Sequence, residues 1–394
     1  MKNLTTLLLL IAVFIFVGCS APIKYDIIIN NVGLFDGDID RGIVNIGIRN
    51  DSIISISKEP LQGDSIIDGT NKYVIPGMVN AHVHVSTLEE LKESYSFGIL
   101  ANLNMHTGLE KRELEWKNMS KDSIGYPLLF GSGHAATVPN SHPNQFSPDM
   151  ETINDSISIK QWVDNRLANN VDYIKIVRDN HSWMGRPPLP TLSYEQIKQI
   201  IDYTHSKGYK AVVHAVHADD FLEISKFKPD GFVHMWDYKE NAQLKDEDYK
   251  MIAESGAFIV LTSGITLKTA TMDLPPFMKT FLKENILNSD ERKDIIKKIH
   301  DYGITIIAGT DAQQGQMNFG DDYYYELDLY KQAGLSNLEV LKTATGNPSK
   351  EFDIPVGTIE VGTKPNMLLI SGNPIESLDF IKKIELIWKN GKTE

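Results

Sequence analysis

Through the middle of the chain, short apolar runs alternate with stretches whose hydrophobic and polar positions follow a helical period. Two of the helical stretches, residues 193–208 and 289–303, each begin with a serine that can cap a helix and end at a glycine. The strand-like runs lie at residues 78–85, 97–106, 127–133, 172–177, 210–216, 230–236, 257–262 and 303–311. This alternation predicts a parallel sheet closed into a (β/α)8 barrel over residues 73–349. An open doubly wound sheet is the alternative, but no G-x-G-x-x-G motif follows any of these strands.

The two ends of the chain have a different pattern, in which glycine, asparagine and aspartate interrupt β-branched residues. Residues 25–72 contain YDIIINNVGLFDGD, residues 356–394 contain VGTIEVGTKPNMLLISGNP, and neither region shows a helical period. We therefore predict one small sheet domain built from both ends of the chain, residues 23–72 and 350–394.

The first residues resemble an export signal. Lys2 is followed by an apolar run from Leu7 to Gly18, which is shorter than the ~20 residues that a membrane span needs. The segment FVGCS resembles a bacterial lipoprotein cleavage site, so we predict a signal peptide at residues 1–19 with Cys19 as the lipidated residue. The protein would then be exported and anchored by lipid to a bacterial membrane, at its periplasmic side or at the cell surface. An ordinary secretory signal cut nearby is the alternative.

Composition narrows the functional classes. The net charge of -13 and the absence of a basic cluster argue against binding to nucleic acid. Cys19 is the only cysteine, so the mature domain has neither a disulfide nor a thiolate ligand.

Side chains that can bind metals recur at the ends of the predicted barrel strands. His82 and His84 lie one residue apart and therefore project from the same face of a strand. Four further candidates lie on four other strands: Lys175, His214, His234 and Asp311. Because a barrel collects its chemistry at the C-terminal ends of its strands, we expect all six side chains to meet at one mouth.

Each of these residues has a simpler interpretation when it is taken alone. His214 or His234 could be a hydrogen-bonded core histidine. Lys175 could pair with a carboxylate, and Asp311 could cap the next helix. It is their common position in the predicted barrel that favours a metal site.

The residue types then suggest the chemistry. Imidazoles and a carboxylate without cysteine suit zinc or another divalent ion, which would make a hydroxide nucleophile from bound water near neutral pH. Asp311 would bind the metal, orient the water and carry its proton to the leaving group. An uncharged Lys175 could react with CO2 to give a carbamate that bridges two metals.

The whole pattern resembles the amidohydrolase superfamily. The resemblance rests on IPGMVNAHVH, DYIKIV, GFVHMW, AGTDA and the terminal ATGNPSKEFDIPVG, and it covers nearly all of the chain after the signal. It implies a (β/α)8 barrel with a small β-sandwich, and a centre of two zinc ions. One ion would be held by His82, His84 and Asp311, the other by His214 and His234, and carboxylated Lys175 would bridge them.

Within the superfamily, Lys175 in DYIKIV is similar to the imidazolonepropionase-like and Xaa-Pro dipeptidase branch. That branch implies hydrolysis of an amide bond in a dipeptide, an N-acyl amino acid or a related small molecule. Candidate substrate contacts are His142, Arg178 and Tyr238, with a salt bridge as the alternative role of Arg178. The sequence departs from relatives at Asn80, where many have aspartate, and in the segment ILANLNMHTG.

Two other functions remain open. A mononuclear zinc deaminase would need an acidic residue shortly after His214, where this chain has Ala215, Val216 and His217, and it would not use Lys175. A lipid-anchored binding protein that lost catalysis would not need Asp311.

Overall fold

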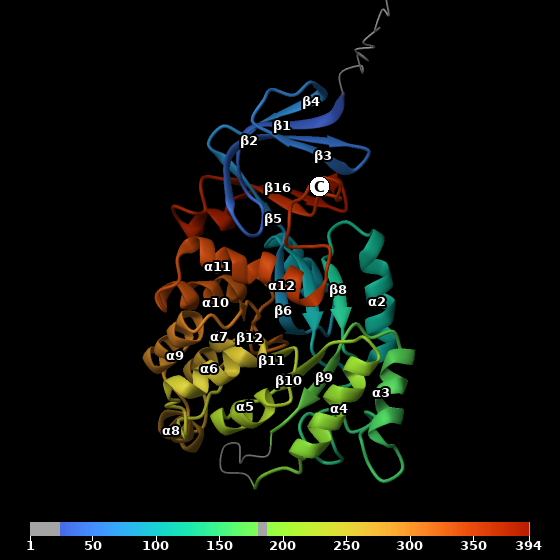
Figure 1. Cartoon of the computed structure of the whole chain (residues 1–394), viewed down its shortest axis with the longest axis vertical. Helices are drawn as coiled ribbons and strands as arrows, with labels where there is room; N and C mark the ends of the chain where they lie inside the picture. The colour runs from blue at the N-terminus through green and yellow to red at the C-terminus, as the bar shows by residue number, and fades with distance from the viewer. Residues whose placement is uncertain (1–23, 180–186, 394) are drawn as a thin grey trace, which may run out of the picture.

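The computed structural model describes residues 24–179 and 187–393, so the predicted signal peptide and Cys19 lie outside the described residues. Figure 1 shows a small sheet at one end of the molecule and a larger body of strands and helices below it. Within the described ranges, none of the helices has both the length and the apolar character that crossing a membrane requires.

Strands from both ends of the chain form one eight-stranded sheet, as their turn-rich β pattern predicts. Its order is β17-β16-β15-β5-β1-β2-β3, with β4 paired to β1. The strands are β1 (Tyr25–Phe35), β2 (Asp40–Arg49), β3 (Ser52–Ser57), β4 (Gly63–Asp68), β5 (Lys72–Pro76), β15 (Met367–Ser371), β16 (Ile384–Lys389) and β17 (Lys392–Thr393). The two chain ends join where β15 runs antiparallel to β5, with Leu369 opposite Val74. Both residues are fully buried in the core of this sheet.

The domain boundaries that we predicted cut two of the observed elements. The eight-stranded sheet extends past the predicted boundary at residue 72, because the whole of β5 pairs with β15. At the other boundary, residue 350 lies inside α12 (Gly346–Phe352), and this helix packs on β6 (Met78–His84) and β13 (Ile306–Ile307).

The middle of the chain contains two parallel sheets. One has the order β14-β6-β7-β8 and the other β13-β12-β11-β10-β9. Their strands are β6 (Met78–His84), β7 (Ile99–Asn104), β8 (Leu128–Gly131), β9 (Ile174–Val177), β10 (Ala211–His214), β11 (Gly231–Val233), β12 (Phe258–Val260), β13 (Ile306–Ile307) and β14 (Ala312–Gln313). The contacts that join the sheets include a parallel bridge between Ala136 and Ile176 and a 3.0 Å hydrogen bond from the Ala81 amide to the Ala308 carbonyl.

The last predicted strand, residues 303–311, forms only in part. Within it Ile306 and Ile307 make β13, which pairs with β12, and a separate strand, β14, follows the predicted range and pairs with β6. Asp311 lies between β13 and β14 with a φ of 58°, a conformation that interrupts a strand. This break positions the Asp311 side chain beside the end of β6.

Helices follow most of the strands and lie around them (Figure 1). Besides α12 they are α1 (Leu88–Ser96), α2 (Glu110–Asp122), α3 (Ile159–Ala168), α4 (Tyr194–Ser206), α5 (Ala218–Ser225), α6 (Asp246–Ser255), α7 (Ser263–Thr271), α8 (Pro276–Asn285), α9 (Ser289–Asp301), α10 (Asp321–Gln332) and α11 (Asn337–Ala344). A short 3₁₀ helix, η1, covers Leu378–Lys382.

The two helices predicted from serine caps both form. Ser193 caps α4, and this helix buries Ile197, Ile200 and Ile201 at the spacing of one helical face. The cap of α9 is Asn288, not the predicted Ser289, because the Asn288 side chain accepts the amides of residues 290 and 291.

Candidate metal centre

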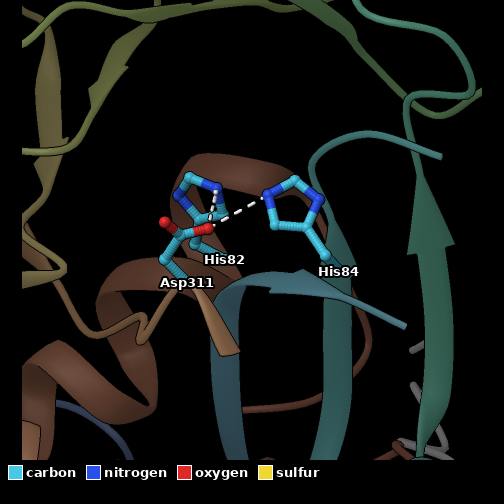
Figure 2. Close-up of side chains that lie close together, drawn as sticks. All are labelled: His82, His84 and Asp311. Carbon is cyan, nitrogen blue, oxygen red and sulfur yellow. Dashed lines mark ion pairs between the residues drawn. The ribbon is translucent and has the colours of Figure 1, made fainter. Parts of the chain in front are cut away.

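The histidine pair at the end of β6 meets Asp311 (Figure 2). Oδ1 of Asp311 lies 3.2 Å from Nε2 of His82 and 3.0 Å from Nε2 of His84. One possible ligand atom from each residue lies within 4.8 Å of those of the other two, so the group could hold a metal ion. His82 is fully buried, whereas His84 is partly open to solvent. A substrate could therefore reach the group from the His84 side.

The backbone around Asn80 fixes this geometry. The Asn80 side chain accepts a 3.1 Å hydrogen bond from the Thr310 amide and donates one of 2.9 Å to the Thr310 hydroxyl. The Asp311 amide in turn donates to the carbonyl of His82 at 2.8 Å. Asn80 is fully buried, so its amide group ties β6 to the turn that presents Asp311. An aspartate at this position could not donate to Thr310 while ionised.

A second histidine pair faces the first. His214 ends β10, and His234 follows β11 with a φ of 86°, which is rare for a residue other than glycine. Their ring centroids are 4.4 Å apart, and the His234 ring lies 4.7 Å from that of His82. Nδ1 of His234 lies 2.7 Å from the hydroxyl of Thr262, which fixes the ring orientation.

Lys175 lies on β9, where it is the second residue of the strand and pairs with Val212 in register. Only 2% of its surface is exposed. Burial lowers the pKa of its ammonium to about 7, and the negative charge of Asp311 opposes that shift. Its positive charge in turn lowers the pKa of His82, so it belongs to the same electrostatic group.

The protonation of this group suits metal binding. Burial lowers the pKa of His82 and of His214 well below the ordinary value, and that of His234 to about 4. Burial raises the pKa of Asp311, but the neighbouring His84, His234 and Lys175 outweigh it and keep that pKa below its ordinary value. Neutral imidazoles and an ionised carboxylate are the forms in which these groups bind metals.

Several ligand atoms lack partners within the described part of the chain. Both ring nitrogens of His82, Nε2 of His214 and Oδ1 of Asp311 are buried there without a hydrogen bond of good geometry. A buried polar atom without a partner costs about 1–3 kcal/mol. Polar atoms that converge in this way, from residue types that bind divalent ions, fit a metal ion as the missing partner.

The three candidate substrate contacts lie in different surroundings. The His142 ring lies 5.3 Å from that of His214, and burial lowers its pKa to about 4. Tyr238 is buried, and its ring stacks on His217 at 4.0 Å. Arg178 already forms a salt bridge within the fold, because its Nε lies 3.0 Å from Asp220 and its guanidinium donates to the Leu192 carbonyl at 2.6 Å.

Sequence reasoning did not identify Thr262 or Glu326 as contributors to this region. Glu326 on α10 is fully buried and accepts hydrogen bonds from the amides of Ser263 (2.8 Å) and Gly264 (2.6 Å) at the start of α7. Thr262 precedes that helix with a φ of 48°, and its hydroxyl contacts His234. Glu326 thus supports the turn that orients His234. Glu326 lies 62 or more positions in sequence from the two amides that it accepts, so no local pattern links them.

We compared the chain with known protein families, curated proteins and solved structures. Residues 146–393 match the Amidohydrolase family. A 5-methylthioadenosine/S-adenosylhomocysteine deaminase of Caldicellulosiruptor saccharolyticus is 22% identical over 360 residues, covering 82% of this chain and 78% of that protein. A solved Xaa-Pro dipeptidase with bound methionine has a TM-score of 0.78 at 18% identity, covering 93% of this chain and 99% of that one.

A prolidase complexed with N-methylphosphonate-L-proline has a TM-score of 0.76 at 16% identity, with 93% of this chain and 99% of that one covered. At such identities the structural likeness shows an α/β amidohydrolase fold and nothing finer. The family match and the curated relative add the reaction class, which is chemistry at carbon–nitrogen bonds. This chain belongs to the amidohydrolase family and is an enzyme that acts on carbon–nitrogen bonds.

Proposed function

We propose that the protein is a metal-dependent hydrolase that cleaves an amide bond in a dipeptide or an N-acyl amino acid. The observation that carries this proposal is the convergence of His82 and His84 on Asp311, with buried ligand atoms that make no hydrogen bond of good geometry to any described residue. Likeness to the Xaa-Pro dipeptidase and the prolidase supports the substrate class.

The proposed centre has two zinc ions. His82, His84 and Asp311 would hold one ion, and His214 and His234 the other. Lys175 would bridge them as a carbamate: its neutral Nζ would attack the carbon of CO2, forming a C–N bond as one C=O π bond opens to give a negatively charged oxygen, and one N–H proton would leave to solvent. The lowered pKa of about 7 supports this step, because only the neutral amine is nucleophilic. We also propose that the two parallel sheets close into one (β/α)8 barrel and that the eight-stranded sheet folds as a β-sandwich.

The residues would divide the work as follows. The bound metal would activate water and polarise the amide carbonyl. Asp311 would accept the proton of the attacking water and deliver it to the leaving nitrogen, for which its depressed pKa supplies an ionised carboxylate at the start of the reaction. His142 and Tyr238, on the loops beyond β8 and β11, would contact the substrate. Arg178 would need to exchange its bond to Asp220 before it could join them.

A deaminase is the second candidate, favoured by the curated relative from Caldicellulosiruptor saccharolyticus. Against it, Ala215 and Val216 follow His214 where that chemistry would need an acidic residue nearby. The two reactions release different products: a deaminase releases ammonia, whereas the proposed hydrolase releases an amino acid.

The test is turnover by protein that lacks residues 1–19, reconstituted with zinc and bicarbonate. The panel should contain dipeptides, N-acyl amino acids and adenosine derivatives, with a chelated sample and the D311N variant as controls. Metal-dependent release of an amino acid supports the proposal. Release of ammonia alone would favour the deaminase. Tight binding without turnover would favour a binding protein that has lost catalysis.

We also propose that the protein is exported and lipid-anchored through Cys19, which rests on sequence alone. Detergent phase partitioning of the full chain and of the C19S variant tests this. The wild type should enter the detergent phase and C19S should not, and equal partitioning would overturn the anchor.

A further inference from the structure

The histidines at the candidate centre differ in which ring nitrogen carries a proton. Nδ1 of His84 lies 3.1 Å from the carbonyl oxygen of His106. A carbonyl only accepts hydrogen bonds, so this Nδ1 must carry the proton and Nε2 keeps its lone pair. That lone pair lies on the side of Asp311, where a metal ligand needs it.

His106 has the opposite arrangement. The backbone amide of Ala135 donates a 3.2 Å hydrogen bond to Nδ1 of His106, so Nδ1 is an acceptor. In the neutral ring the proton must then lie on Nε2. His106 is therefore a hydrogen-bond donor rather than a ligand.

The proton on Nε2 of His106 has no acceptor in the described part of the chain, although the atom is buried. His106 follows β7, and its ring centroid lies 6.3 Å from that of His84. Its backbone carbonyl also holds His84, so the ring has a fixed place beside the candidate metal group. A buried N–H donor without a partner in the protein is satisfied if a bound molecule supplies an oxygen that accepts the hydrogen bond.

His142, beside the second histidine pair, has its ring proton on the same nitrogen. The side-chain amide of Gln145 lies 3.0 Å from Nδ1 of His142, and an amide nitrogen only donates, so Nε2 carries the proton here as well. The His142 ring lies 5.3 Å from that of His214. Each histidine pair of the candidate centre thus has one neutral donor histidine beside it.

We propose that His106, together with His142, donates a hydrogen bond from Nε2 to an oxygen of the substrate that is negatively charged or becomes so during the reaction. That oxygen is the carboxylate or the amide carbonyl of the substrate, and a donor beside each histidine pair would help to orient the molecule. This inference rests on the proposed hydrolase function and adds a substrate-binding residue to the same site.

Three variants test His106: H106L removes the donor, H106Q retains an N–H donor, and H205Q changes a histidine on the distant helix α4. Bound metal, and kcat/KM for the amide substrates of the panel, are measured for all three. We expect H106L to keep its metal and to lose about 10²–10³-fold in kcat/KM. H106Q should recover roughly tenfold of that loss, and H205Q should match the wild type.

The outcomes separate this inference from the function on which it rests. Wild-type kcat/KM in H106L, or loss of metal in both His106 variants, would overturn the role of His106. If the wild type hydrolyses no amide, the proposed function fails, and a two-bond ¹H–¹⁵N spectrum of ¹⁵N-histidine-labelled protein still decides the donor. The wild-type signal that disappears in H106Q belongs to His106. If that signal has the pattern of the Nε2–H form the inference is supported, and if it has the pattern of the Nδ1–H form the inference is overturned.

Discussion

The carboxylates of Glu326 and Asp311 have opposite surroundings. Glu326 accepts three hydrogen bonds, two from the start of α7 and one of 2.8 Å from Tyr330. Asp311 faces two imidazole nitrogens, and its Oδ1 makes no hydrogen bond of good geometry within the described ranges. Burial raises the pKa of Glu326 to about 7, whereas the pKa of Asp311 stays below its ordinary value. A carboxylate whose partners are all supplied by the fold is structural, and one that lacks them is available for chemistry.

The buried lysines repeat this contrast. Lys389 donates to the backbone carbonyl of Ser123 at 2.7 Å and also to that of Ser120, both near the end of α2. Burial lowers its pKa to about 8. Lys175 is equally buried, but its charge interacts with Asp311 and with the histidines of the candidate centre. Low pKa alone therefore does not mark a functional lysine, and its neighbours do.

The largest effect should follow from D311N. We expect kcat/KM for the panel's amide substrates to fall by about 10²–10⁴-fold, because an amide cannot accept and return the proton. D301N is the matched control, since Asp301 pairs with Lys297 and His300 on the surface of α9. Wild-type activity in D311N would remove Asp311 from the mechanism.

Replacing each buried lysine by methionine should separate their roles. We expect K175M to bind roughly one equivalent of zinc where the wild type binds two, because the bridge is lost. K389M should keep its zinc and lose about 1–3 kcal/mol in the free energy of unfolding, because two buried carbonyls lose their donor. Elemental analysis measures the bound zinc, and urea unfolding measures the free energy of unfolding, for both variants. Equal zinc content in K175M and wild type would contradict the bridge.

Removing the hydroxyl of Thr262, which contacts His234, should have a smaller effect. In T262V the Nδ1 atom of His234 loses its partner, so we expect zinc affinity to fall by about 10–100-fold. The control is T271V, an exposed threonine at the end of the same helix. Competition with a chelator measures both variants, and equal affinities would show that Thr262 does not orient the ligand.

The smallest effect concerns pH. Unfolded Glu326 ionises near its ordinary value of 4.5, whereas the folded protein keeps the proton until about pH 7. Between these values the folded state binds more protons, so its stability falls as pH rises, by up to about 1.4 kcal/mol per pH unit. E326Q should flatten that slope, whereas E339Q, at an exposed helix cap with a lowered pKa, should keep it. Unfolding free energies measured from pH 4.5 to 7 decide this, and an unchanged slope in E326Q would contradict it.

Most of the strands, and the histidines that end β6 and β10, could be predicted because their signals are local. Apolar runs identify β6 and β10, and each ends in a histidine that the sequence displays directly. The turn between β13 and β14 could not be predicted. In this turn Thr310 binds Asn80 across 230 residues, and Asp311 has a positive φ.

Pairing partners were equally invisible to sequence patterns. The bond of Arg178 to Asp220 spans 42 residues, and the contact from Ala135 to the His106 ring spans 29. Both depend on how loops meet at the strand ends, so neither the salt bridge nor the protonated nitrogen of His106 follows from local residue order. The choice of Asn288 over Ser289 as a helix cap is a smaller case of the same kind, since either residue type can cap.

The most direct test of the account is the metal content of the wild-type protein lacking residues 1–19. Elemental mass spectrometry after reconstitution with zinc and bicarbonate should find about two divalent ions per chain, as a bridged centre requires. One equivalent or less under the same conditions would contradict the two-metal centre and bring the deaminase forward.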